Sequence, residues 1–180
     1  MSIATKHDAG GKSRPAWPSD STVSARFSEC DKYRYELSEI WDRSKPLVLW
    51  ILMNPSVACL DYSDPTLRKT GRFARAWGYG GQLVGNVHAY RATNRRKLLG
   101  VVDPVGPEND KSILSMASLA QTVVLGYGHP PKAIKSRGQK VAQMLSHHPA
   151  LCYLKLAKDG ITPWHPLYLP ADLCTTPYRE

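Results

Sequence analysis

The chain has 180 residues, which is enough to bury one sizeable core but short for two domains. Hydrophobic residues make up 42% and charged residues 22%, so wholesale disorder is excluded, and no apolar run approaches the ~20 residues of a membrane-spanning helix. The net charge is +9, which favours an anionic partner, and the first residues lack the apolar core of a secretory signal. We therefore expect a monomeric cytoplasmic protein with no membrane partner.

The N-terminal part predicts a tail, a hairpin and a buried strand. Residues 1–22 mix Gly, Ser, Pro and Lys with few large apolar groups, so we expect a flexible basic tail and a single domain over residues 23–180. Residues 25–28 and 33–37 alternate around a polar turn, a pattern typical of a β-hairpin. Residues 47–53 are apolar throughout, as in a strand that is covered on both faces.

A helix with a basic face is predicted next. It begins at Asp64-Pro65, with Asp64 as the N-cap and Pro65 at the first helical position, and it ends at Gly78. From Pro65 to Val102 the chain has no acidic residue, and this segment therefore holds a strong local excess of positive charge. Its basic residues are Arg68, Lys69, Arg72, Arg75, Arg91, Arg95, Arg96 and Lys97. Such an excess favours a nucleic-acid or nucleotide partner over a merely solvated basic face.

The remaining elements define the fold class. Strands are predicted over residues 82–87, 123–126 and 151–154, and helices over residues 107–120 and 136–146. Strands that alternate with helices indicate a parallel sheet with right-handed crossovers. We expect an α/β protein with three α/β/α layers and a central, mostly parallel four-stranded sheet, to which the N-terminal hairpin is an addition.

The motifs of several enzyme classes are absent from the chain. The chain contains no phosphate-binding loop, dinucleotide fingerprint, zinc-protease motif or serine-hydrolase elbow. The four cysteines are widely spaced and form no C-x-x-C pair, which argues against a zinc site or an iron–sulfur cluster. We therefore predict free thiols, no metal and no cofactor.

Polar residues occur near the ends of the predicted strands. Asn54-Pro55-Ser56 follows the strand over residues 47–53, and ligands of open α/β sheets bind at the carboxyl ends of the strands. Asn86 lies within an apolar strand, where a buried amide needs a partner or a ligand. Taken singly, Asn54 is better explained as a turn cap and His165 as a packing or surface residue.

Seven longer segments carry a family resemblance. They are Phe27-Ser28-Glu29-Cys30, Asn54-Pro55-Ser56, Asp64-Pro65-Thr66, Trp77-Gly78-Tyr79-Gly80-Gly81, Tyr90-Arg91-Ala92-Thr93, the run from Asp103 to Asp110, and the run from His165 to Pro170. Through these segments the chain resembles the family known as domain of unknown function 1643, over most of its length. That resemblance names no activity.

Shorter motifs resemble the uracil-DNA glycosylase superfamily. Asn54-Pro55-Ser56 is similar to the Asn-Pro-Gly of its mismatch-specific branch, in which the Asn positions the attacking water. Val84-Gly85-Asn86-Val87 resembles the strand whose Asn reads the pyrimidine edge, and His165-Pro166-Leu167 resembles the His-Pro-Ser motif with Leu in place of Ser. The resemblance implies a uracil-DNA glycosylase-like fold. It also implies slow turnover, because the Asp of the better-known branch is absent from the first motif.

The resemblance also implies roles for individual residues. Asn54 and His165 are the expected catalytic residues: the first holds water, and the second donates a hydrogen bond to the departing base. The expected substrate-binding residues are Ser56, Asn86, Tyr90, Arg91 and Tyr168. The expected phosphate contacts are Arg68, Arg72, Arg75, Arg95, Arg96 and Lys97. Leu167, Tyr168 and Leu169 are candidates for a wedge that fills the gap left by a flipped base.

The predicted function is DNA-directed base processing. Its simplest form is a monofunctional N-glycosylase that flips out and excises a modified or mismatched base without a metal. Two alternatives remain. One is a non-catalytic module of the same fold that binds nucleic acid or a modified base. The other is an enzyme that acts on free nucleotides or nucleosides, for which Asp61, Asp64 or Asp103 matters more.

Overall fold

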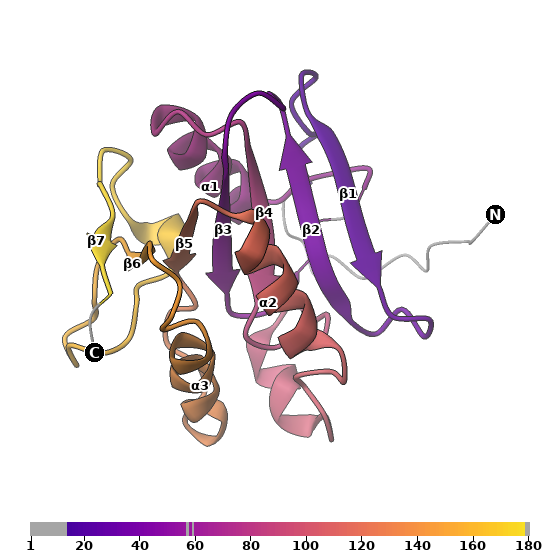
Figure 1. The fold of residues 1–180 in the computed structure, drawn as a ribbon. Coiled ribbons are helices and arrows are strands. Elements are labelled where there is room, and N and C mark those ends of the chain that lie inside the picture. The colour runs from indigo at the N-terminus through magenta and orange to yellow at the C-terminus, as the bar shows by residue number, and fades with distance from the viewer. Residues whose placement is uncertain (1–13, 57, 59, 179–180) are drawn as a thin grey trace.

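The computed structural model describes residues 14–56, 58 and 60–178, which form a mixed α/β fold around one sheet (Figure 1). The strands are β1 (Thr22–Phe27), β2 (Arg34–Ile40), β3 (Leu47–Leu52), β4 (Gly81–Asn86), β5 (Thr122–Leu125), β6 (Leu151–Tyr153) and β7 (Thr176–Pro177). The α-helices are α1 (Pro65–Ala76), α2 (Asn109–Leu119) and α3 (Ser136–Met144). Three short 3₁₀ helices are η1 (Arg95–Gly100), η2 (Lys132–Ile134) and η3 (Pro166–Tyr168).

The described strands form one seven-stranded mixed sheet in the order β1-β2-β4-β3-β5-β6-β7. The middle strands β4, β3, β5 and β6 are parallel, whereas β2 and β7 add to their two outer edges in the antiparallel sense. The predicted four-stranded sheet is therefore too small. The hairpin is part of the sheet because buried side chains such as Leu37 pair directly with β4, at Leu37↔Val84.

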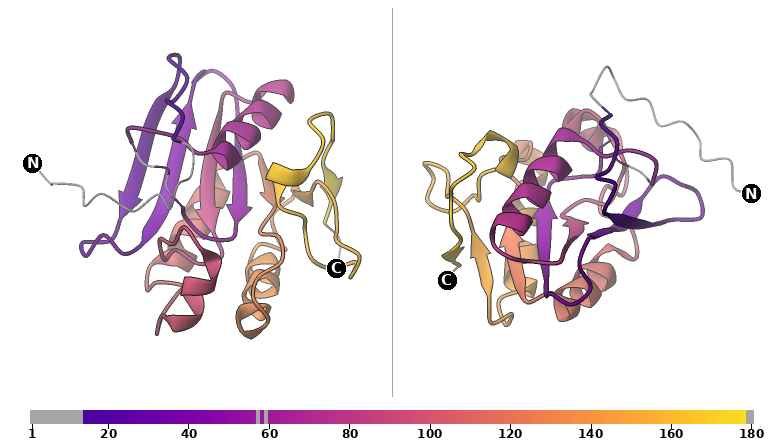
Figure 2. Two further views of the ribbon diagram at one scale, coloured as in Figure 1. Left: turned by 180° about the vertical axis from the view of Figure 1, so that it is seen from behind. Right: turned by 90° about the horizontal axis from the view of Figure 1, so that it is seen from above.

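Two apolar cores lie on the two faces of the sheet. Side chains alternate along a strand, so Leu49 and Ile51 of β3 contribute to the core under α2 and α3, while Trp50 contributes to the core under α1. The Trp50 ring stacks on Trp77 with the ring centroids 5.6 Å apart. The views from opposite sides show α2 and α3 over one face, and α1 with the C-terminal segment over the other (Figures 1 and 2). The three predicted layers are therefore present.

Helix α1 begins where the sequence predicts. The Asp64 side chain accepts a hydrogen bond from the Leu67 N–H at 2.9 Å, and Pro65 occupies the first turn. Gly78 follows the helix with φ +84°, a conformation that favours glycine. Because α1 connects β3 to β4, which are parallel, its N-terminus lies at the carboxyl edge of the sheet.

The chain reverses direction across the sheet at β3. After β3 it runs through α1 to β4 on one side, and after β4 it crosses through α2 to β5 on the other side. The loops that leave the carboxyl ends of β3 and β5 therefore diverge. In open α/β sheets this switch point forms the crevice in which ligands bind.

The expected N-terminal tail lies partly outside the described residues, which begin at residue 14. Residues 14–21 lie against the domain: the Ser63 N–H donates to the Pro15 carbonyl at 2.8 Å, and Arg75 forms an ion pair with Asp20 at 2.9 Å. Trp17 packs against the core under α1. Within the described part of the chain, no helix combines the length and apolarity that a membrane span requires.

Candidate functional site

A cavity of about 570 Å³ opens at the carboxyl edge of the sheet, at the switch point between β3 and β5. Segments distant in the sequence meet there: the loop after β3, the start of α1, the end of β4, the start of η1, the loop after β5 and the segment around η3. Its polar and aromatic lining includes Arg34, Asn54, Ser56, Asp64, Thr66, Asn86, Thr93, Asn94, Arg95, Tyr127, His129, Trp164, His165 and Tyr168. Cavities of this size hold small organic ligands.

Asn54 joins two of the loops that form the cavity. Its Nδ2 donates to the Pro55 carbonyl at 2.9 Å and to the Ala92 carbonyl at 2.7 Å. Because both partners are carbonyl oxygens, the orientation of the amide is fixed and Nδ2 is fully used. The group that Asn54 offers to a ligand or a water is therefore the acceptor Oδ1.

Asn86 ends β4 and is only 2% exposed, yet it lines the cavity. Its Oδ1 has no hydrogen-bond partner among the residues that the structure describes. A buried polar atom without a partner costs about 1–3 kcal/mol. This free energy is recovered if a ligand in the cavity donates a hydrogen bond to the amide.

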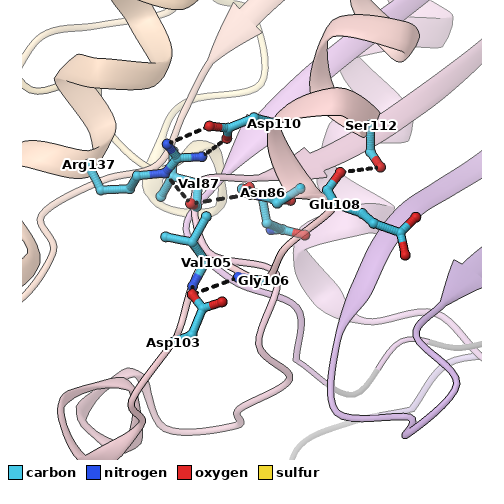
Figure 3. A network of polar contacts seen from close by, with 10 residues as sticks. Asn86, Val87, Asp103, Val105, Gly106, Glu108, Asp110, Ser112 and Arg137 are labelled. Carbon is cyan, nitrogen blue, oxygen red and sulfur yellow. Dashed lines mark hydrogen bonds and ion pairs between the residues drawn. The ribbon is translucent and has the colours of Figure 1, made fainter.

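A polar network holds the chain around Asn86 in place (Figure 3). The buried Asn109 at the start of α2 donates from Nδ2 to the Asn86 carbonyl at 2.9 Å. Arg137 at the start of α3 donates from Nε to the Val87 carbonyl at 2.9 Å and forms an ion pair with Asp110. The network ties two helix N-termini to the end of β4, so the backbone that carries Asn86 is fixed before a ligand binds.

His165 caps η3 and also lines the cavity. Its Nδ1 accepts a hydrogen bond from the Leu167 N–H at 3.4 Å, so the neutral ring carries its proton on Nε2 and is a donor there. The loop after β5 approaches closely at Gly128, which has φ +66° and whose added Cβ would lie 3.1 Å from the His165 Cβ. The rings of His129 and Trp164 meet edge to face, with centroids 6.0 Å apart, and extend this wall.

The family model for the DUF1643 proteins, described as proteins of unknown function, matches residues 34–167. The chain belongs to the DUF1643 family. Neither a curated protein nor a solved structure matches it. The matched DUF1643 region runs from β2 to η3 and contains every residue of the cavity lining except Tyr168. The more distant resemblance to uracil-DNA glycosylases stays a prediction.

Six of the predicted site residues meet at this DUF1643 cavity. They are Asn54, Ser56, Asn86, Arg95, His165 and Tyr168. The seven segments that carry the DUF1643 resemblance also supply Asp64, Thr66, Ala92, Thr93 and Leu167 to the lining. Segments that are scattered along the sequence therefore gather around one space, which makes the cavity the candidate functional site of this DUF1643 protein.

Two predicted substrate-binding residues lie away from the cavity lining. Arg91 forms an ion pair with Asp31 at 2.7 Å and lies over the Phe27 ring, 4.8 Å from its centroid. Tyr90 packs edge to face against Tyr33 with centroids 5.7 Å apart. Both side chains join the hairpin to the loop after β4. The local sequence, a basic and aromatic run, did not distinguish this structural role from ligand binding.

The predicted basic surface divides into two groups. On α1, Arg75 is paired with Asp20 and lies 4.1 Å from the Trp41 ring centroid, and Arg68 donates to the Ala16 carbonyl at 3.4 Å, whereas Arg72 is exposed. None of these three lines the cavity. The η1 group, Arg95, Arg96 and Lys97, is exposed and begins at the cavity mouth, where Arg95 donates to the His129 carbonyl at 2.9 Å.

Two buried charged residues of the lining were not among the predicted glycosylase residues: Arg34 was missed, and Asp64 was predicted only as a helix cap and for the free-nucleotide alternative. Asp64 is 7% exposed and is the one carboxylate among the described lining residues, so the site does contain a carboxylate, although not in the first motif. Its role as a helix cap explains Asp64 at the level of local sequence, so nothing in the sequence indicated a second role in base excision. Arg34 is 3% exposed and donates to the Ala58 carbonyl at 2.9 Å. Arg34 is the first residue of β2, and a charged residue at the start of a buried strand could have indicated its role.

Of the three wedge candidates, only Tyr168 is well exposed. Leu169 is buried in the core under α1, and Leu167 lines the cavity. Among the described residues, no group of three or more His, Cys, Asp or Glu side chains has the arrangement of a metal site. The polar groups of the lining include amides, hydroxyls, imidazoles, the guanidinium groups of Arg34 and Arg95, and one carboxylate.

Proposed function

We propose that this DUF1643 protein hydrolyses the N-glycosidic bond of a nucleotide in DNA, with the flipped base held in the cavity. The observation that carries the proposal is the meeting of Asn54, Asn86 and His165 in one cavity at the switch point of the sheet. These are the residues through which the chain resembles uracil-DNA glycosylases. The cavity volume of about 570 Å³ is sufficient for a base with its sugar.

In this reaction the bond between C1′ of the sugar and the base nitrogen breaks while a water oxygen bonds to C1′. Negative charge develops on the base, and the Nε2–H of His165 stabilises it by donating a hydrogen bond to a base oxygen. Asn54 Oδ1 accepts a hydrogen bond from the attacking water. The proton that this water releases passes to the Asp64 carboxylate, and the departing base is protonated from solvent.

Asn86 and the aromatic side chains of Trp164 and Tyr168 recognise the base. The Asn86 amide sits on a backbone that is fixed by Asn109, so its acceptor and donors meet the edge of a base at a defined position. Trp164 and Tyr168 supply ring faces at the mouth of the cavity. Enzymes that flip a base recognise it by hydrogen bonds to its edge and by aromatic side chains that stack on its faces.

A second candidate is hydrolysis of free nucleotides or nucleosides. The buried Arg34 favours it, because a guanidinium in the lining is suited to the phosphate of a small ligand that enters the cavity completely. It is also favoured by the engagement of Arg68 and Arg75 with residues 14–21, which leaves fewer arginines for a long strand.

Base release tests both candidates. The protein is incubated with single- and double-stranded oligonucleotides that carry uracil, hypoxanthine, hydroxymethyl-pyrimidines or mismatches, and with the corresponding free nucleotides, and free bases are detected by mass spectrometry. Release from an oligonucleotide is expected. Release from free nucleotides alone supports the second candidate. Salt-sensitive retention on DNA without any release identifies a binding module instead.

The matched variants are His165→Asn and His148→Asn. Asn at position 165 keeps an acceptor for the Leu167 N–H but cannot place a donor where Nε2 was, so base release is expected to fall about 100-fold or more. His148 makes the same kind of contact, Nδ1 accepting from the Ala150 N–H at 3.2 Å, and does not line the cavity. His148→Asn should therefore release base at the wild-type rate. Equal rates for both variants would remove His165 from the reaction.

A further inference from the structure

The segment after β4 projects exposed apolar side chains beside its basic group. Val102 is fully exposed and Leu99 is half exposed, and they lie five and two residues after Lys97, the last residue of the basic run Arg95-Arg96-Lys97. This segment contains η1, drawn in pink at the foot of the molecule in Figure 1. Exposed apolar side chains that lie together beside polar or charged residues mark candidate contact surfaces.

The segment is anchored at both ends, so its tip is presented in a defined position. At the start, Asn94 Oδ1 accepts from the Arg96 N–H at 2.9 Å, and the side chain of Leu98 is buried. At the end, the Asp103 carbonyl accepts from the Tyr33 hydroxyl at 2.9 Å, and Asp103 Oδ1 accepts from the Val105 N–H at 3.0 Å. Leu99 and Val102 lie between these anchors.

The position of the segment indicates what it contacts. Asn94 and Arg95 line the cavity, so the tip is continuous with the site that holds the base. Arg95, Arg96 and Lys97 are exposed and adjacent in the sequence, which makes this segment complementary to a polyanion. Proteins that unstack a duplex combine these two features, an apolar side chain between base steps and basic side chains on the flanking phosphates.

We propose that residues 94–102 form the element that enters the DNA duplex beside the extruded base. Leu99 and Val102 occupy the space that the base leaves in the stack, and Arg95, Arg96 and Lys97 hold the adjacent phosphates. This inference rests on the proposed function, since the cavity must receive a base. It replaces Leu167 and Leu169, whose side chains lie in the cavity wall and in the core, as the wedge, and it leaves Tyr168 as an aromatic contact for the base.

The test uses the double variant Leu99→Ser/Val102→Ser, which keeps every charge of the segment. Duplex and single-stranded oligonucleotides with 2-aminopurine next to the target base report unstacking by fluorescence. The variant is expected to lose roughly tenfold or more in base release from duplex DNA and to lose the fluorescence rise, while release from single strands stays unchanged. The control is Leu119→Ser, an exposed leucine at the opposite edge of the sheet, which should behave as wild type.

Each outcome separates the wedge from the chemistry. A fluorescence rise with wild type but not with the variant supports the wedge even where no base is released, in which case only the proposed function fails. An unchanged variant on duplex DNA overturns the wedge and leaves the proposed function standing. If the double variant instead loses binding to phosphatidylserine vesicles and keeps its behaviour on DNA, the tip is a membrane contact and the inference is wrong.

Discussion

At the scale of single residues, Asp64 combines two roles that one substitution separates. As N-cap of α1 its Oδ1 accepts from the Leu67 N–H, and as a lining residue it is the only carboxylate of the described wall of the cavity that Asn54 also lines. Asn is as good an N-cap as Asp but cannot accept the proton of the attacking water. Asp64→Asn is therefore expected to fold with a wild-type Tm and to lose about 100-fold in base release.

Asp103→Asn is the matched control for this prediction. Asp103 also accepts backbone N–H groups through Oδ1, from Val105 and Gly106 at 3.0 Å each, and it lies outside the cavity lining. Base release and thermal unfolding are measured for both variants. A wild-type rate for Asp64→Asn shows that the carboxylate only caps the helix, whereas a low Tm shows that the lost activity has a structural cause.

The same residues show what a sequence discloses about a site. Asn86 could be predicted because an amide inside an apolar strand has no local explanation. Asp64 was named only for the free-nucleotide alternative, because its capping role accounts for it at the level of local sequence. Arg91 was misleading for the converse reason: its partner Asp31 is distant in the sequence, and only the fold brings the two together.

At the scale of elements, η1 and α1 carry similar numbers of basic residues but differ in their availability to DNA. Arg95→Ala/Arg96→Ala/Lys97→Ala in η1 is expected to reduce the slope of log affinity against log salt by about 2–3, since each lost phosphate contact removes about 0.9. The control, Lys111→Ala/Lys140→Ala/Lys158→Ala, removes the same charge from exposed positions outside the cavity lining. Its slope should be that of wild type. Similar slopes for the two variants would show that DNA contacts the protein through its net charge alone.

The elements themselves followed from local patterns, but their pairing did not. Apolar runs predicted β3, β4, β5 and β6, and the Asp-Pro signal predicted the start of α1. The edge strands were different. Whether a hairpin joins a sheet depends on contacts between β2 and β4, more than 40 residues apart, and periodicity within either strand carries no information about that pairing.

At the scale of the whole molecule, stability is expected to depend on pH through His88. This residue follows β4 and is fully buried, and burial, together with the nearby positive charge of Arg137, lowers the pKa of its imidazole from 6.5 to about 4. Between these two pH values the unfolded chain binds a proton that the folded protein excludes. The free energy of unfolding therefore falls as the pH is lowered through this window, by about 3 kcal/mol at pH 4.

The measurement is the midpoint of urea unfolding at a series of pH values from 7 to 4. His88→Leu, which has a similar volume and no titratable group, should flatten this dependence, even if it changes stability at pH 7. His147→Gln is the control, because His147 is exposed and its substitution should leave the profile unchanged. If the His88 variant keeps the wild-type slope, the acid sensitivity does not come from His88.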